Sequence, residues 1–219
     1  NVTFSGNTAA SSGGGMFNFF NSDPTLTNVT FSGNTAASSG GGMLNFSNSN
    51  PTLMNVTFSS NTAQYNGGGM HNDTSNPVLT NVILWENTAP TGSQVYNDGS
   101  TPGISHSVVQ GGCPEGSTCS NIITTDPLLG TLGNYGGSTE TIPLLPSSSA
   151  IDAGNDANCP STDQRGVTRP QGSHCDIGVY EVTPPGAATL ISPTGDIGTN
   201  YDPTYTWNKV TESSWYQLS

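Results

Sequence analysis

Apolar residues in the first half of the chain recur at one fixed spacing and alternate locally with polar residues. Within each period, three short runs place one apolar residue between polar neighbours, as at 41–45, 51–54 and 56–58. Alternation with a period of two predicts half-buried β-strands. The apolar columns, each spaced by 25 to 27 residues, are Phe4, Phe31, Phe58 and Leu84; Met16, Met43, Met70 and Val95; and Leu26, Leu53, Leu79 and Ile104.

These strands are each too short to be stable alone, so their arrangement follows from how they bury their apolar side. Equivalent residues return in the same direction in every period, which excludes two-stranded hairpins and favours parallel stacking of identical units. Parallel crossovers are overwhelmingly right-handed. We therefore predict an all-β fold, a right-handed parallel β-helix with three short strands per coil of about 27 residues and a coil spacing of about 4.8 Å.

The repeat is strict at its start. Residues 1–16 return unchanged at 28–43, and a fourth, degenerate copy extends to about residue 112. Identity over so many positions exceeds what packing requires, and it indicates a recent duplication in an array whose length is free to vary.

Three columns of asparagine accompany the three strands of each coil. Asn tolerates the left-handed backbone that a corner needs, and stacked amides hydrogen bond to the coils above and below. We therefore expect an Asn ladder at each corner. The columns are Asn7, Asn34, Asn61 and Asn87; Asn18, Asn45, Asn72 and Asn97; and Asn28, Asn55 and Asn81, with His106 in the fourth place.

The repeat of about 27 residues does not continue after residue 112. Residues 1–112 hold the repeat, and 113–182 are expected to form irregular final coils and a cap. Thr-Pro-Pro-Gly at 183–186 predicts a linker. Residues 187–219 resemble the first strands of an immunoglobulin-like or fibronectin-like module with Trp207 as a core residue, although a complete sandwich needs about 100 residues.

Charge limits the classes of partner. The net charge is −12 with only three Lys and Arg residues, namely Arg165, Arg169 and Lys209. Binding to nucleic acid or to anionic lipid needs a basic surface, so we expect neither. No apolar run is long enough to span a membrane, so we expect no membrane insertion of this segment. For the two arginines we expect structural ion pairs with Asp152, Asp156, Asp163 and Asp176.

Four cysteines fall into two groups by spacing, Cys113 with Cys119 and Cys159 with Cys175. An even count in loop-like segments predicts two disulfides and an oxidising, extracellular compartment. Four free thiols are the alternative. A zinc site is less favoured, because the pairs are not Cys-x-x-Cys and His174 is the only imidazole nearby.

Two stretches carry a resemblance to known families. The Phe-x-x-Asn motifs at 4–7, 31–34 and 58–61, with the glycine-rich motifs at 13–16, 40–43 and 67–70, resemble the repeats of polymorphic outer membrane proteins. The stretches 126–154 and 163–181 resemble the C-terminal region of choice-of-anchor Q surface proteins. Together the resemblances cover about residues 1–181. They imply a secreted or surface-attached bacterial β-helix with adhesive or anchoring roles, and they imply no catalytic residue.

One face of the predicted coils is a candidate contact surface. Side chains next to the inward Met column must point outward, which exposes a partly aromatic column: Phe17, Leu44, His71 and Tyr96. An exposed apolar ladder is costly unless something covers it. It would stack on sugars, pack against another chain, or be covered by the protein's own loop, Phe19, Phe20 and Phe46 included.

Acidic residues offer few candidates for catalysis or metal binding. A glycosidase needs two carboxyl groups about 5 to 9 Å apart. Asp73 and Asp98 each follow an Asn and would stack on adjacent coils, so they form the one candidate dyad or calcium site of the array, with two turn aspartates as the simpler interpretation. Asp126, Asp152 and Asp156 are weak Ca²⁺ candidates, because the segment lacks the spacing of a calcium loop. No cofactor is therefore required.

These observations leave two functional hypotheses. The first is a non-enzymatic extracellular stalk or adhesin that contacts glycans or a neighbouring cell surface. The second is a carbohydrate-active or glycan-binding β-helix that uses the Asp73 and Asp98 face. The chain begins in mid-coil at Asn1, and strand edges invite pairing. We therefore also expect head-to-tail self-association into a filament, with a longer polypeptide that supplies the missing coils as the alternative.

Overall fold

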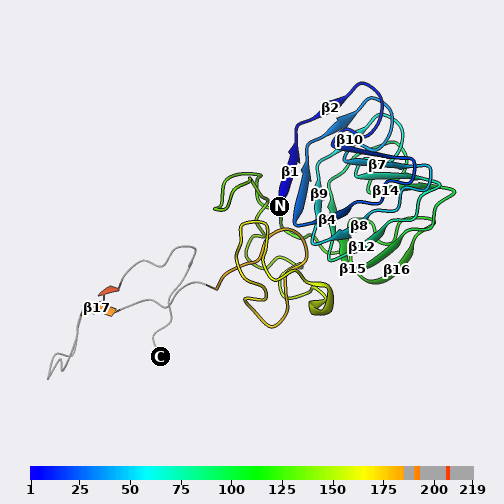
Figure 1. The fold of residues 1–219 in the computed structure, drawn as a ribbon. Coiled ribbons are helices and arrows are strands. Elements are labelled where there is room, and N and C mark those ends of the chain that lie inside the picture. The colour runs from blue at the N-terminus through cyan, green and yellow to red at the C-terminus, as the bar shows by residue number, and fades with distance from the viewer. Residues whose placement is uncertain (185–189, 193–205, 208–219) are drawn as a thin grey trace, which may run out of the picture. The chain divides into compact units, whose positions relative to one another are not determined.

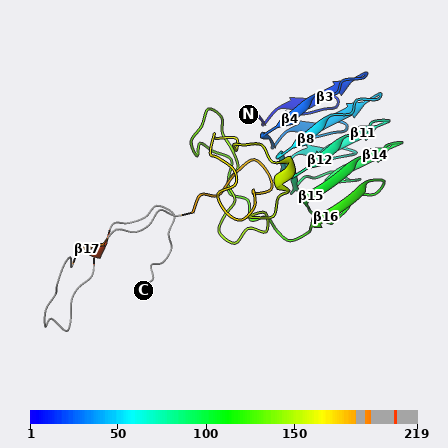
Figure 2. The ribbon, with the colours of Figure 1, turned by 60° about the horizontal axis from the view of Figure 1, so that its bottom comes forward.

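The computed structural model describes residues 1–184, 190–192 and 206–207. Residues Asn1–Val182 form one compact unit, and Thr183–Ser219 belong to a second unit. The first unit is all-β, with parallel strands stacked in a β-solenoid of about four turns (Figures 1 and 2). The predicted fold class is confirmed, and the hand of the coil stays a prediction.

Each long side of the solenoid is a ladder of parallel strands from successive coils. The first side contains β1 (Val2–Ser5), β5 (Val29–Ser32), β9 (Thr57–Ser59), β13 (Ile83–Trp85) and the second half of β15 (Gly103–Val109). The second side contains β3 (Met16–Phe19), β7 (Met43–Phe46), β11 (Met70–Asp73) and β14 (Val95–Asp98). The third side contains β4 (Thr25–Thr27), β8 (Thr52–Met54), β12 (Val78–Thr80) and the first half of β15. β16 (Thr118–Ile123) stacks on both halves of β15.

A short fourth ladder was not predicted. Its strands are two residues long, and each pairs an exposed Thr with an Ala that points toward the core. Two residues are too few for an alternating pattern to be recognised. The strands are β2 (Thr8–Ala9), β6 (Thr35–Ala36) and β10 (Thr62–Ala63).

Inward side chains stack in register along the solenoid and form its core. Phe4 lies opposite Phe31, and Phe31 lies opposite Phe58, as the period of the sequence predicts. The ring centroids are 4.9 and 4.6 Å apart, and the ring planes are nearly parallel. Phe31 and Phe58 are fully buried, so each coil presents the same apolar surface to the next.

Two asparagine columns form the expected ladders. Each side-chain amide nitrogen donates to the amide oxygen one coil further on, and in the first column that oxygen also accepts from a main-chain N–H. In the first column, bonds of 2.8–2.9 Å join Asn7, Asn34, Asn61 and Asn87. In the second, bonds of 2.8–2.9 Å join Asn18, Asn45, Asn72 and Asn97.

The left-handed backbone expected at all three columns occurs at only one of them. Asn28, Asn55 and Asn81 have φ values of 53°, 50° and 55°, and His106 continues the column at 46°. In the first ladder the left-handed residue is the one before the asparagine, such as Gly33 with φ 64°. The ladder amides therefore serve hydrogen bonding, and the corner conformation there is supplied by a neighbour.

Residues 126–182, which we call the strap, lie beside the coils rather than across their end (Figures 1 and 2). This differs from the cap that the sequence suggested. The third asparagine column binds the strap: Nδ2 of Asn28 donates to the carbonyl of Thr162, and Nδ2 of Asn55 donates to that of Asp176. The strap contains isolated bridges and one 3₁₀ helix, η1 (Asp156–Asn158).

The strap covers the outward side chains of the first side. Thr30, Thr57, Ile83 and Val108 point away from the core, yet each is almost fully buried. Ile83 and Val108 pack with strap residues such as Ile177 in a second hydrophobic cluster. An apolar outward column needs a cover, and this explains why the residues after the last coil lie along the side.

The loop 110–117 closes the far end of the coils. The second ladder ends where Nδ2 of Asn97 donates to the carbonyl of Glu115 at 2.7 Å. The first ladder ends where Nδ2 of Asn87 donates to Oε1 of Gln94, whose Nε2 donates to Oε1 of Gln110. Both ladders thus terminate on groups of the same chain.

Both predicted disulfides are present. Cys113–Cys119 links the closing loop to β16, and Cys159–Cys175 lies within the strap. Two disulfides are typical of an oxidising environment.

In the second unit, β17 (Leu190–Ser192) pairs antiparallel with β18 (Thr206–Trp207), and Leu190 lies opposite Trp207. The predicted linker at 183–186 is described only to residue 184. The remainder of the expected immunoglobulin-like or fibronectin-like segment, and the core position of the Trp207 side chain, lie outside the described residues.

Candidate functional site

The second side of the solenoid presents two columns of outward side chains, which we call the open face. Met16, Met43, Met70 and Val95 point inward, as do the Asn residues of β3, β7, β11 and β14, so the residues between and beside them point outward. The pairing of the strands fixes both columns in register. One column is Phe17, Leu44, His71 and Tyr96, and the other is Phe19, Phe46, Asp73 and Asp98.

The half of the open face nearest the N-terminus is apolar, and it is exposed on the first coil, whereas Leu44 on the second coil is buried. Phe17 and Phe19 expose 52% and 56% of their surface, and Phe20, the next residue along the chain, exposes 67%. The sequence left open whether Phe19, Phe20 and Phe46 belong to a loop that covers this column. The structure places Phe19 and Phe46 in β3 and β7, where they form part of the face itself.

The rings on this half pack against one another along the solenoid. Phe19 and Phe46 stack with centroids 5.8 Å apart and an interplanar angle of 11°, and Phe17 is tilted against Phe19 by 59°. Stacked rings on successive coils turn their flat faces toward each other and their edges toward solvent. Such a ridge suits contact with an apolar surface better than stacking of a sugar ring on an aromatic plane.

The other half of the open face is polar and carries two carboxylates. Asp73 lies directly opposite Asp98 on the neighbouring strand, as the sequence predicted. Strands paired in this way are about 4.8 Å apart. The hydroxyl of Thr74 donates to Oδ1 of Asp73 at 3.2 Å.

His71 is the most confined group on this half. It lies opposite Leu44 on one side and Tyr96 on the other, and the Tyr96 ring meets it edge-on with centroids 5.1 Å apart. Both imidazole nitrogens are buried and have no hydrogen-bond partner among the described residues. Burial lowers the pKa of His71, although the charges of Asp73 and Asp98 oppose this effect. The imidazole is therefore neutral near neutral pH.

The weak calcium candidates are used for hydrogen bonds within the strap. Asp126 Oδ1 accepts from the N–H of Leu128. Asp152 Oδ1 accepts from the N–H of His174, while Asp156 binds the His174 ring and the N–H of Cys175. Within the part of the chain that the structure describes, no three His, Cys, Asp or Glu side chains gather as a metal site would require.

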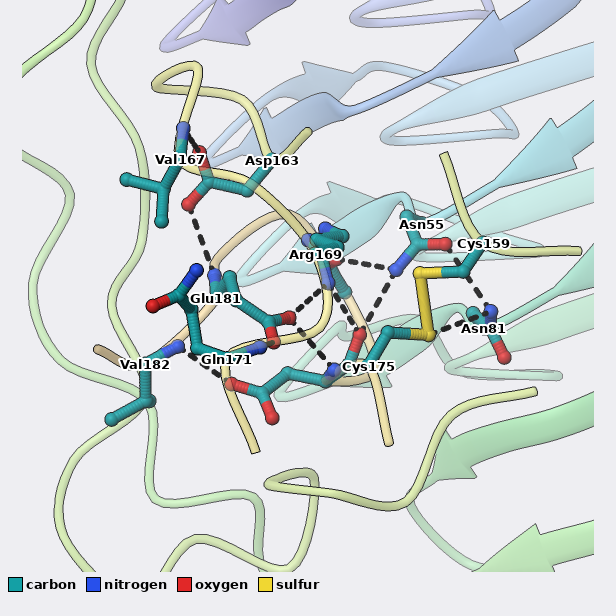
Figure 3. A network of polar contacts seen from close by, with 12 residues as sticks. Asn55, Asn81, Cys159, Asp163, Val167, Arg169, Gln171, Cys175, Glu181 and Val182 are labelled. Carbon is teal, nitrogen blue, oxygen red and sulfur yellow. Dashed lines mark hydrogen bonds and ion pairs between the residues drawn. A yellow bond between two sulfur atoms is a disulfide. The ribbon is translucent and has the colours of Figure 1, made fainter. Parts of the chain in front are cut away.

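The two arginines form the structural ion pairs that the sequence suggested, but with partly different acids. Nη1 of Arg169 lies 2.9 Å from Oε2 of Glu181, and both side chains are buried (Figure 3). Nη2 of Arg165 lies 2.8 Å from Oδ2 of Asp163. Glu181 was missed because only aspartates were considered as partners.

This buried network attaches the strap to the coils. Arg169 also donates to the carbonyls of Asp176 and Gly178, and those two carbonyls accept from Nδ2 of Asn55 on the coil (Figure 3). Oδ1 and Oδ2 of Asp176 accept from the N–H groups of Asp152 and Val182. Burial raises the pKa of Asp176 to about 6. The network is therefore structural, since its bonds join the strap to Asn55 of the coils.

Comparison of the chain with models of protein families, with curated proteins and with solved structures gives no match. In the described segments, no helix is long and apolar enough to cross a membrane. The resemblances to polymorphic outer membrane proteins and to choice-of-anchor Q proteins therefore stay predictions, and the functional argument depends on the open face.

Proposed function

We propose that this chain is a non-enzymatic stalk or adhesive element of an extracellular surface, and that the open face is its contact surface. The observation that carries this proposal is the contrast between two sides of one solenoid. On the first side, the outward column of Thr30, Thr57, Ile83 and Val108 is buried beneath the strap. On the second side, Phe17, Phe19 and Phe20 remain more than half exposed.

The chemistry of the open face supports a macromolecular partner. Three exposed phenylalanines in contact with one another form a continuous apolar patch, which is uncommon on a surface without a binding role. Aromatic side chains contribute much of the affinity where they are buried in an interface. The rigid ladders behind the face hold these rings at fixed positions, so little ordering is needed on contact.

The extracellular assignment rests on the two disulfides and on the surface chemistry. Disulfides persist in oxidising compartments and are rare in the cytosol. The scarcity of Lys and Arg, with a net charge of −12, suits a surface that meets neutral partners rather than phosphates.

Adhesion of coated beads tests the proposal. Beads carrying the 219-residue chain would be passed over a panel of cultured cell monolayers, and the retained fraction measured under flow. We expect Phe19→Ser together with Phe20→Ser to reduce retention several-fold, because the exposed apolar surface is lost. Tyr65→Ser is the matched control, since Tyr65 is 56% exposed and lies outside the open face. Equal retention by both variants and the wild type would refute the open face as the contact surface.

A carbohydrate-active site is a second candidate, supported by the register of Asp73 and Asp98. Two carboxyl groups on adjacent strands have roughly the separation of a retaining glycosidase pair. Neutral glucan and mannan polymers would be incubated with the chain and reducing ends measured. Turnover that Asp98→Asn abolishes would favour this candidate over the adhesive one.

End-to-end assembly has less support. The ladders end at Glu115 and Gln110 of the same chain, and the closing loop lies beyond β14, where a coil of another copy would stack. A filament formed by direct continuation of the ladders would have to displace this loop.

A further inference from the structure

A cavity of about 660 Å³ lies at the end of the second side, between β14 and the closing loop 110–117. It exists because the chain omits one strand. β15 ends at Val109, and the next strand begins at Thr118 on the third side, so nothing in the described part of the chain pairs with the free edge of β14. The cavity occupies the place of the missing strand.

The walls of the cavity combine polar and apolar surface and carry almost no charge. Side-chain amides from the last coil and from the loop meet there, together with one tyrosine and one carboxylate. The glycines of the loop add main-chain groups without side chains. The polar residues used in the argument are Gln94, Tyr96, Asn97, Gln110 and Glu115.

Several of these groups are fixed in position. Oε1 of Gln110 accepts from the N–H of Glu86 at 2.8 Å and from Nε2 of Gln94 at 3.0 Å. With the oxygen held in this way, the amide nitrogen of Gln110 donates no hydrogen bond within the described residues and is left for a ligand. Tyr96 packs on His71 on the side away from the cavity, so its ring is held in place as part of the cavity wall.

The charge around the cavity excludes most ligand classes. The first basic residue of the chain is Arg165, which belongs to the strap, so phosphates and uronates would find no cation on the cavity walls. Glu115 is the one acidic side chain of the lining, so a divalent cation would find too few ligands. Fixed amides, a carboxylate and an aromatic ring match a neutral ligand rich in hydroxyl groups.

An added peptide strand fits less well, although β14 has a free edge. A strand paired with β14 would continue the second ladder above Asn97. The ladder bond that such a strand would form is already made, because Nδ2 of Asn97 donates to the carbonyl of Glu115 and to the hydroxyl of Ser117, and the cavity lies beside these bonds.

We propose that this cavity binds a short neutral saccharide, with Gln110 and Glu115 as hydrogen-bonding residues and Tyr96 as the apolar contact. The volume lies within the usual range for small-ligand sites, about 300–1,000 Å³. This site is separate from the apolar half of the open face, so it does not depend on the proposed adhesive function.

Titration of the 219-residue chain, followed by amide NMR shifts, tests the proposal. The probes are cellotriose, mannotriose and xylotriose, with trigalacturonate as the anionic control and a Gly-Gly-Met-Leu-Asn-Phe-Ser peptide as the strand control. We expect at least one neutral trisaccharide to shift the amides of 94–97 and 110–116. Gln110→Ala and Glu115→Gln should each raise its Kd about tenfold, because each removes a bond to the ligand.

Val78→Ala, at an exposed position of the third side, is the control variant and should leave the Kd unchanged. The proposal is overturned if no neutral probe shifts these amides at about 10 mM, if the shifts lie on the apolar half of the open face, or if only the peptide binds. Loss of bead adhesion in the Phe19 and Phe20 variant with unchanged saccharide binding would separate the two sites.

Discussion

The hydroxyl of Thr30 donates a hydrogen bond of 2.7 Å to Oε1 of Gln164, although 134 residues separate the two in the chain. Gln164 is 1% exposed. Its Nε2 donates to the carbonyl of Val2 and to the hydroxyl of Thr3, so one side chain of the strap joins the first two coils.

Gln164→Ala is expected to destabilise the chain. It leaves the buried hydroxyl of Thr30 without its acceptor and removes the bonds to the carbonyl of Val2 and the hydroxyl of Thr3. Each buried polar group left without a partner lowers the free energy of unfolding by about 1–3 kcal/mol. The free energy of unfolding from urea denaturation measures the loss. Gln64→Ala, at an exposed position of the coils, is the control and should change it little. A Gln164 variant as stable as this control would contradict the role of the strap contact.

Asn61→Ala is expected to weaken the middle of the first ladder. The change leaves the N–H of Asn34 and the carbonyl of Phe31 without their side-chain partner and removes one of the two bonds that Nδ2 of Asn34 donates, so a loss of about 3 kcal/mol is expected. Hydrogen exchange should show lower protection on the neighbouring coils. Asn134→Ala removes an exposed amide with one local bond and serves as the control. Unchanged protection around residue 61 would show that the ladder contributes little.

Asp176 is expected to give stability a distinct dependence on pH. Its pKa rises from 3.8 unfolded to about 6 folded, so the folded state binds the proton more tightly. Its contribution therefore favours folding at low pH and is lost as the pH rises through about 4 to 6. The free energy of unfolding of the wild type, measured with urea, should fall over this pH window relative to that of the Asp176→Asn variant, whose side chain cannot ionise. If the free energy of unfolding depends on pH in the same way for both proteins, the raised pKa of Asp176 is contradicted.

The two disulfides are expected to differ in their effect on stability. Cys159–Cys175 closes a loop with a sequence separation of 16 residues, whereas Cys113–Cys119 spans 6. The chain-entropy account predicts about 3 kcal/mol for a loop of about 15 residues and less for a shorter one. Urea unfolding of the Cys159→Ser/Cys175→Ser and Cys113→Ser/Cys119→Ser variants makes the comparison. Mass measurement with and without reductant establishes the pairing, and four free thiols in the native protein would refute it.

The coils could be predicted from sequence because their contacts repeat with the period of the sequence. Phe31 meets Phe58 and Asn34 meets Asn61 for the same reason, namely that residues 27 positions apart face each other. The open face followed from alternation alone, since the neighbour of an inward Met must point outward. The alignment of Asp73 with Asp98 followed in the same way.

The strap could not be predicted in this way. Its contacts, such as Asn28 with Thr162, join a periodic segment to one without a period, so no spacing reveals them. The outward Ile83 and Val108 were a usable signal, because an apolar outward column on one side requires a cover. The end cavity had no such signal, since it results from a strand that the chain omits.

The strap also sets a limit on the number of coils. A duplicated unit of 27 residues inserted between the second and third coils would preserve every ladder, because each coil presents the same groups to the next. The strap would not tolerate it: Thr162 reaches Asn28, and Asp176 reaches Asn55 one coil further on. One added coil would separate these partners by a further 4.8 Å or so. The strap therefore fixes the number of coils between Asn28 and Asn81, and a duplication within this span would break its contacts with the coils.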